Sequence, residues 1–256
     1  AAGGIGRELT QRIEAAGGSD GFRSYTLAEA SADPVTITNF PFNPEVVKIV
    51  ADDMAHEAGV DVFLHSRVVR PLMDDRRISG LVLENVSGRR VLRSHMLIDA
   101  SGDAVVAAAA GVGFVGEEPE LRAQRQPLTL VFRMSNVDVR SFRAVPREQK
   151  RAIALEGLRQ GKLAWESLSF CSTPGDTDAI CLMSRIHGID ALDGAQLSRA
   201  ERAGRQQIKT IVPFLRERVP GFEKSVLAGI AERVGIRETR RIVGRHTLTT
   251  DDIVGG

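Results

Sequence analysis

Residues 98–103, with the sequence Ile-Asp-Ala-Ser-Gly-Asp, could bind a ligand through their backbone. We expect residues 96–99 to form a strand that leads into a helix beginning near Gly102, and ligands of α/β proteins collect at the carboxyl ends of such strands. Ser101 and Gly102 have little side chain, so a ligand can approach the backbone closely. Asp103 could accept hydrogen bonds from ligand hydroxyls. The residues leave open a plainer alternative, in which Ser101 or Asp103 only caps the helix.

A second segment, residues 235–244, places charged side chains between two isoleucines. As a strand, it would direct four side chains to one face: Ile236, Glu238, Arg240 and Ile242. If the isoleucines face a core, Glu238 and Arg240 must satisfy each other or polar neighbours, because an unpaired buried charge is strongly destabilising. Arg240→Ala should then lower the unfolding midpoint markedly. The opposite face would carry Arg237, Thr239 and Arg241, where they could meet an anionic ligand, so Arg241→Ala should scarcely change the midpoint. The alternative is a solvated edge strand.

Two literal motif matches fail when their surroundings are considered. Residues 111–116 match G-x-G-x-x-G, but a helix is expected before them, whereas a dinucleotide loop needs a strand there. Residues 17–21 match G-x-S-x-G and also follow an expected helix, so they are not a nucleophile elbow. The histidines are scattered and no Cys-x-x-Cys occurs, so no metal site is predicted. Cys171 and Cys181 are expected to be buried free thiols.

Composition favours a protein that acts on small molecules over one that binds nucleic acid or spans a membrane. The 256 residues carry 34 basic and 33 acidic side chains, a net charge of +1, which leaves no basic excess for a phosphate backbone. No apolar run reaches the roughly 18 residues of a membrane span, and no signal peptide is recognised. We therefore expect a small-molecule substrate, no nucleic-acid or membrane partner and a cytoplasmic location. The sequence leaves the oligomeric state open, a homo-oligomer included.

Hydrophobic periodicity predicts a mixed α/β (α+β) chain. Ile5, Leu9 and Ile13 share one face of a first helix, and Asn43-Pro44-Glu45 starts a second. From Val60 the period changes to two, which predicts short strands that form a small antiparallel meander attached to an αβ unit. These strands are expected at residues 60–64, 66–72, 78–85, 89–94 and 96–99.

The second half of the chain alternates strands and helices. A helix is expected to open at Pro146, and a long one over residues 194–219 should be kinked or split by Pro213. Strands are expected at residues 127–134, 164–171, 179–186, 225–234 and 235–243.

Several segments, taken in the order in which they occur in the sequence, resemble the bacterial FAD-dependent oxidoreductase family, whose flavin domain is like those of glutathione reductase and fumarate reductase. Residues 98–103 are similar to the family's IDATGD signature, with Ser for Thr. Residues 235–244, with Thr247-Leu248-Thr249 and Asp251-Asp252 behind them, are similar to its GIRESRRIVG…TL…D segment. Weaker matches are residues 3–9, Asn43-Pro44-Glu45 and residues 59–62.

The resemblance implies FAD as cofactor and hydride transfer from a small organic substrate. It implies that the cofactor is bound by Ala100, Ser101, Gly102 and Asp103, and that the backbone of Val68 lies near the adenine. Arg237 and Arg240 are the candidate catalytic residues, since they could hold a substrate anion or stabilise the negative charge of reduced flavin. The implied domains are a partial FAD-binding domain (1–116), a substrate-binding domain of mixed sheet and helices (117–234) and a return segment toward the FAD domain (235–256).

Members of that family open with a strand, a G-x-G-x-x-G turn and a helix, and this sequence does not contain that opening. We therefore expect it to be the central fragment of the enzyme, to bind FAD weakly or not at all in isolation, and to need the rest of the enzyme for activity. The alternative is a protein of another class: a non-catalytic module that binds no flavin and acts through a protein partner.

Overall fold

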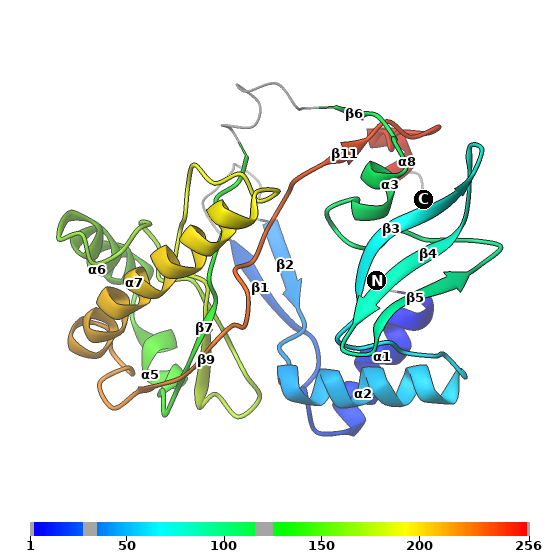
Figure 1. Cartoon of the computed structure of the whole chain (residues 1–256). Helices are drawn as coiled ribbons and strands as arrows, with labels where there is room; N and C mark the ends of the chain where they lie inside the picture. Colours follow the sequence, from blue (N-terminus) through cyan, green and yellow to red (C-terminus); the bar gives the residue numbers. More distant parts are fainter. Residues whose placement is uncertain (1–2, 28–34, 116–124, 255–256) are drawn as a thin grey trace. The chain divides into compact units, whose positions relative to one another are not determined.

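The computed structural model describes residues 3–27, 35–115 and 125–254, which divide into two units (Figure 1). The first unit contains Ala1–Asp61, Leu128–Ile189 and Ala195–Gly235. The second contains Val62–Pro127, Asp190–Gly194 and Ile236–Gly256. The chain therefore passes between the units several times. The predicted domain boundary at residue 116 lies outside the described residues, and the three predicted domains stay a prediction.

The first unit begins with helix α1 (Gly4–Ala15), the hairpin of β1 (Arg23–Leu27) and β2 (Val35–Asn39), and helix α2 (Pro44–Glu57). The predicted start of the second helix is confirmed, because Asn43 Oδ1 accepts a hydrogen bond from the Glu45 amide at 3.0 Å. Of the predicted apolar stripe on α1, Ile13 is buried, whereas Ile5 is 76 % exposed.

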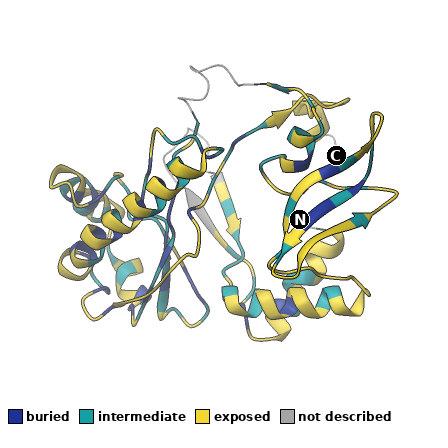
Figure 2. Ribbon diagram, in the orientation of Figure 1, coloured by how far each residue is buried: buried dark blue, intermediate teal, exposed yellow. Residues whose placement is uncertain are grey.

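The core of the first unit lies between a four-stranded antiparallel sheet and helix α7. The strand order is β10-β7-β9-β8, with bounds Val226–Ile230, Phe132–Ser135, Asp178–Cys181 and Phe170–Ser172. Alternate residues Leu130, Phe132 and Met134 are fully buried on one face. Helix α7 (Gly194–Arg218) packs on that side, since a Cβ added to Gly204 would lie 2.7 Å from Leu130 Cβ. Figure 2 shows burial concentrated along these strands and exposure on the outer sides of the helices.

Two further helices complete the first unit. Helix α6 (Arg147–Arg159) has Pro146 at its N-cap, as predicted, and packs on α7 where Gly157 faces Phe214. Helix α5 (Val139–Ala144) precedes it. Pro213 does not split α7, which continues as one helix. No helix in the described part of the chain is both long and apolar enough to cross a bilayer.

The second unit contains the predicted meander. Strands β3 (Arg67–Asp74), β4 (Arg77–Asn85) and β5 (Gly88–Arg93) pair antiparallel in that order, which confirms the predicted antiparallel meander. The remaining elements are short: α3 (Val105–Ala109), β6 (Phe114–Val115), β11 (Arg241–Ile242) and α8 (Thr250–Val254). β6 and β11 pair with each other.

Two predicted strands, residues 60–64 and 96–99, are not strands in the structure. Their apolar side chains stay exposed, with Leu64 at 68 %, Met96 at 82 % and Ile98 at 86 %. A strand needs a hydrogen-bonding neighbour, and among the described residues neither segment has one. The predicted strand over 235–243 shrinks to β11 and an isolated bridge between Gly235 and Thr129. The apolar alternation was present, but the pairing that makes a strand was not.

Candidate functional site

Residues 99–104 form a tight turn that Asp99 fastens to the start of α3. The Asp99 carboxylate accepts hydrogen bonds from the backbone amides of Ser101 (3.1 Å), Val106 (2.9 Å) and Ala107 (3.0 Å), and Ser101 Oγ accepts one from Val105 (3.0 Å). The helix begins at Val105, three residues after the predicted start. The N-cap position is Ala104, which has no side-chain cap, and the Ser101 hydroxyl reaches the first helical amide from three residues upstream of that position, as in the plainer alternative. Asp99 acts with Ser101, a role that the sequence analysis missed although Asp is a common capping residue.

Hydrogen bonding sets the charge state of Asp99. Burial by itself would raise the pKa of this carboxyl, but the hydrogen bonds from Ser101, Ala107 and Val106 favour the ionised form and outweigh burial, so the pKa is lowered. The result is a fixed negative charge on the first turn of α3, where the helix dipole favours it.

Asp103 joins this turn to the second segment predicted to carry function. Thr239 Oγ1 donates to Asp103 Oδ1 at 2.8 Å, and Arg240 Nη1 donates to the Asp103 carbonyl at 3.0 Å. Thr239 is buried, and the Arg240 guanidinium lies 5.7 Å from the centre of the Phe114 ring. Two stretches 136 residues apart in sequence are thereby brought together within one unit.

Glu238 and Arg240 do not pair with each other; each is satisfied by polar neighbours, the second of the two possibilities that the sequence left open. Glu238 instead accepts from the Gln126 amide at 2.8 Å and from Arg241 Nη2 at 2.6 Å. The cause is the backbone: residues 236–240 are not a strand, so the two-residue alternation that would have put Glu238 beside Arg240 does not hold. The amide of Gln126 and the Arg241 guanidinium favour the ionised carboxylate and lower the pKa of Glu238.

The other predicted site residues lie in less enclosed places. Ala100, Ser101 and Gly102 are exposed, and Gly102 has a φ of +78° that a residue with a side chain rarely adopts. Val68 is half-buried in β3, which contacts α3. Arg237 lies on the exposed part of its segment. The structure thus brings Asp103 and Arg240 into contact and places Arg237 outside that contact set.

The rejected motifs have structural roles. The first glycines of the 111–116 match follow α3, as predicted, and Gly116 lies outside the described residues. In the 17–21 match, the Ser19 hydroxyl donates to the Pro41 carbonyl at 2.5 Å and accepts from the Gly21 amide. Both cysteines are free thiols, as predicted, but only Cys181 is buried and Cys171 is exposed. No cluster of metal-ligating side chains occurs within the described ranges.

The turn at 100–103 fits the flat part of a flavin better than it fits a pyrophosphate. A Cβ added to Gly102 would meet nothing within 4 Å, so a ring can reach this backbone, and the Arg240 guanidinium is held at the Asp103 carbonyl. The first amides of α3, which could otherwise bind a phosphate, are occupied by Asp99 and Ser101. In the described part of the second unit, the residues therefore suit the ring end of FAD.

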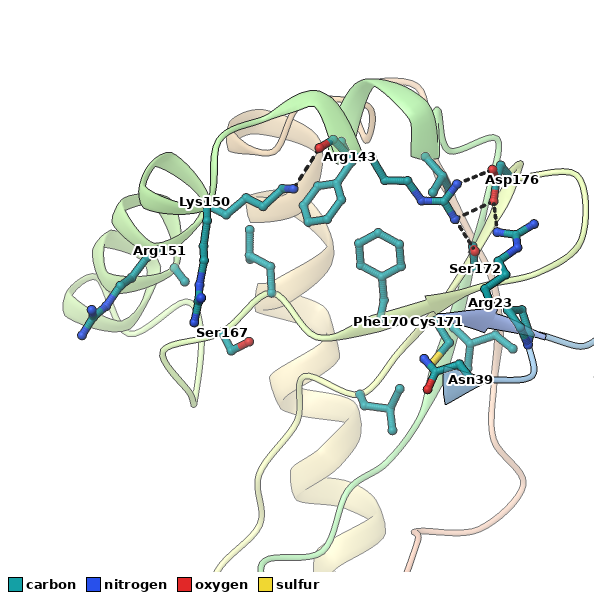
Figure 3. Close-up of a pocket in the computed structure, with 18 of the residues that line it drawn as sticks. Arg23, Asn39, Arg143, Lys150, Arg151, Ser167, Phe170, Cys171, Ser172 and Asp176 are labelled. Atoms are coloured by element: carbon teal, nitrogen blue, oxygen red, sulfur yellow. Dashed lines mark hydrogen bonds and ion pairs between the residues drawn. The ribbon is translucent and has the colours of Figure 1, made fainter. Parts of the chain in front are cut away.

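The first unit contains a large open pocket that the sequence analysis missed (Figure 3). Its volume is about 2000 Å³, and it is lined by the hairpin β1–β2, helices α5 and α6, and strand β8. The Asp176 carboxylate at its edge accepts from Arg143 Nη2 at 2.9 Å and Arg23 Nη1 at 3.3 Å. Burial would raise the pKa of Asp176, but the hydrogen bonds from Arg143 and Arg23 outweigh it, so the pKa is lowered. The available signal was the strand alternation: Val131 and Ile180 alternate with core residues and face the pocket.

A mixed α/β chain with an antiparallel meander, and with a turn of small residues held against a cationic segment, has the features of a flavin-dependent enzyme. Comparison with known families also indicates a flavin-dependent enzyme, and it identifies the family. The chain belongs to the FAD dependent oxidoreductase family, whose pattern matches residues 1–256. The predicted resemblance is confirmed, and FAD is the cofactor.

A solved structure similar to this chain is that of the myxobacterial chondrochloren halogenase CndH, described as a new variant of FAD-dependent halogenases. The two share 18 % sequence identity with a TM-score of 0.51, over 90 % of this chain and 51 % of the halogenase chain. At this identity the similarity shows the fold, which confirms the predicted mixed α/β class. The chain spans about half the length of the halogenase. A search of curated proteins found no match.

Proposed function

We propose that this chain is part of an FAD-dependent oxidoreductase that oxidises a small organic substrate by hydride transfer. The observation that carries the proposal is the contact of Thr239 and Arg240 with Asp103, because it joins the two segments that resemble the flavin family. In the proposed reaction a substrate C–H bond breaks, both of its electrons and the hydrogen pass to FAD, and a proton is released. Bound FAD would supply the two-electron acceptor.

The protein residues would position the flavin and the substrate and would stabilise negative charge. Ala100, Ser101, Gly102 and Asp103 would present backbone to the flavin ring, and the backbone of Val68 would lie near the adenine. The Arg240 guanidinium is fixed by the Asp103 carbonyl and would stabilise negative charge that develops nearby. Arg237, which is exposed, would hold a substrate anion.

The wider organisation follows from the same proposal. Residues 1–116 would belong to the FAD-binding domain, 117–234 to the substrate domain and 235–256 to a segment returning to the flavin. The cytoplasmic location and a homo-oligomeric state stay predictions.

Flavin binding tests the proposal. We expect the purified chain to quench the fluorescence of added riboflavin and FAD in a saturable manner, with weak and nearly equal affinities, because the turn at 100–103 suits the ring and the first amides of α3 are already occupied by Asp99 and Ser101. Arg240→Met should weaken both, whereas Arg241→Met, which removes an exposed partner of Glu238, should weaken neither. Absence of saturable binding would overturn the assignment of the flavin ring to the turn at 100–103. FAD binding far tighter than riboflavin binding would show that our account of the pyrophosphate is wrong.

Turnover is tested separately. In the complete enzyme, under anaerobic conditions, a substrate should bleach the visible absorption of bound flavin, and Arg237→Met should slow that bleaching. Substrate-independent bleaching would remove the support for hydride transfer.

A further inference from the structure

The pocket of the first unit lies on the face of the sheet opposite the apolar core. Leu130 and Phe132 point into the core, and Val131 between them lines the pocket with Ile180 and Leu182. The Phe142 and Phe170 rings lie above this floor with their centres 4.7 Å apart. The pocket therefore offers an apolar floor and an aromatic wall, the lining typical of a small-molecule site.

Lys150 places an ammonium group over the aromatic wall. Its Nζ lies 4.5 Å from the centre of the Phe142 ring and donates to the Arg143 carbonyl at 3.3 Å (Figure 3). No carboxylate in the described part of the chain lies within ion-pair distance of it. An ammonium has three donors, and these contacts use one. Burial alone lowers the pKa of Lys150, as expected for a cation without an anionic partner.

The Asp176 carboxylate, which also lines the pocket, is already paired with other cations. Asp176 is shared between Arg143 and Arg23, so two cations neutralise one carboxylate there. Five Arg or Lys side chains and three Asp or Glu side chains line the whole pocket, which leaves it with an excess of positive charge. The charge complements an anion, and the apolar floor complements a hydrocarbon body.

We propose that this pocket binds an organic carboxylate with an apolar, ring-sized body, whose carboxylate pairs with Lys150 and whose body lies against Phe142 and Phe170. A charge-assisted hydrogen bond of this kind is stronger than a neutral one. A bare inorganic anion would leave the apolar floor uncovered, and a neutral ligand would leave the Lys150 charge without an anionic partner. The binding is independent of the proposed flavin chemistry; only the identification of this carboxylate as the molecule that is oxidised rests on the proposed function.

The experiment uses the 256-residue chain without flavin and three probes: cyclohexylacetate, its neutral analogue cyclohexylethanol, and acetate. Calorimetry gives the affinity, and the emission of Trp165 gives the location. Trp165 is the one tryptophan of the chain, lines the pocket and is 47 % exposed. We expect cyclohexylacetate to bind and to shift the Trp165 emission, and cyclohexylethanol and acetate to bind at least about tenfold more weakly.

Substitutions test whether the Lys150 charge, and not an effect on folding, determines the affinity. Lys150→Met keeps the length of the side chain and should weaken cyclohexylacetate about tenfold or more, to the level of the alcohol, without lowering the unfolding midpoint. Lys224→Met removes an exposed lysine outside the pocket lining and should leave the affinity unchanged. Equal affinity for acid and alcohol, an unchanged affinity of Lys150→Met, no binding of cyclohexylacetate, or binding without a change in Trp165 emission would each overturn the proposal. Because no flavin is present, none of these results bears on the flavin-binding test.

Discussion

Asp99 shows how one carboxylate can define a turn. Three backbone amides donate to it, two of them from the first turn of α3. The helix has only five residues, too few to be stable alone, so the cap and the contacts with β3 must hold it in place.

Asp99→Asn keeps one acceptor oxygen but replaces the other with an NH₂ group and removes the charge, so we expect it to destabilise the chain by about 1–3 kcal/mol, the range for leaving a donor without its acceptor. Because the folded pKa of Asp99 is lowered, its carboxylate stabilises the fold at every pH above the ordinary aspartate pKa of about 4, and this contribution is lost as the pH falls through the folded pKa. Urea unfolding at several pH values measures it. The gap between wild type and variant should be full at neutral pH and close in acid. Asp53→Asn, an exposed position on α2, is the control.

Arg240 and Arg241 should differ in their effect on stability. Arg240 is half-buried and donates to a backbone carbonyl, an interaction of a charged group that contributes about 1.5–3 kcal/mol. Arg241 is 68 % exposed and pairs with Glu238, and exposed pairs contribute about 0–1 kcal/mol. Arg240→Met should therefore lower the unfolding midpoint more than Arg241→Met. A larger effect of Arg241→Met would show that the Asp103 contact is unimportant.

At this scale the sequence singled out two segments that are in contact in the structure, and it did not predict which atoms meet. Residue types marked 98–103 and 235–244, and the structure joins them at Asp103. The partner of Arg240 was missed because it is a backbone carbonyl far away in sequence. The partner of Glu238 was missed because an assumed strand geometry gave the wrong neighbours.

Among the elements, α7 depends on a glycine in its middle. A Cβ at Gly204 would lie 2.7 Å from Leu130 Cβ, so α7 and the sheet would have to separate. We expect Gly204→Ala to destabilise the chain by about 1–3 kcal/mol, the usual effect of overpacking. Gly194→Ala, in the first position of the same helix, meets nothing within 4 Å and should have little effect. Thermal unfolding of the two variants checks this, and equal midpoints would contradict the packing of α7 on the sheet.

Helix starts were predicted better than strands. The signals at Asn43-Pro44 and Pro146 are local, since a cap and a fixed φ act within a few residues. Strands depend on a neighbour that local sequence does not specify. Residues 60–64 have the right alternation and residues 96–99 an apolar run, but neither segment has a partner strand among the described residues. The pocket was missed for the same reason, because it depends on which sheet face the helices cover.

For the molecule as a whole, the two units should differ in stability. The first has a continuous apolar core around Leu130, Phe132 and Met134, whereas in the sheet and helix α3 of the second the buried apolar residues are Val82, Leu83 and Val106. Less buried apolar area gives less stabilisation. Native-state hydrogen exchange should therefore show the amides of β3–β5 exchanging before those of β7 and β9. Equal protection would mean that the units open together.

The two thiols can report separately on ligand binding in the pocket and on opening of the sheet. A thiol reacts as the thiolate; burial raises the pKa of Cys181, whereas Cys171 is exposed and lines the pocket. An alkylating reagent should therefore modify Cys171 in the folded chain, and a carboxylate bound in the pocket should slow that modification. Cys181, on the neighbouring strand, should be modified only when the sheet opens. One mass spectrum, with the two sites resolved after digestion, would then time pocket occupancy and sheet opening in the same sample.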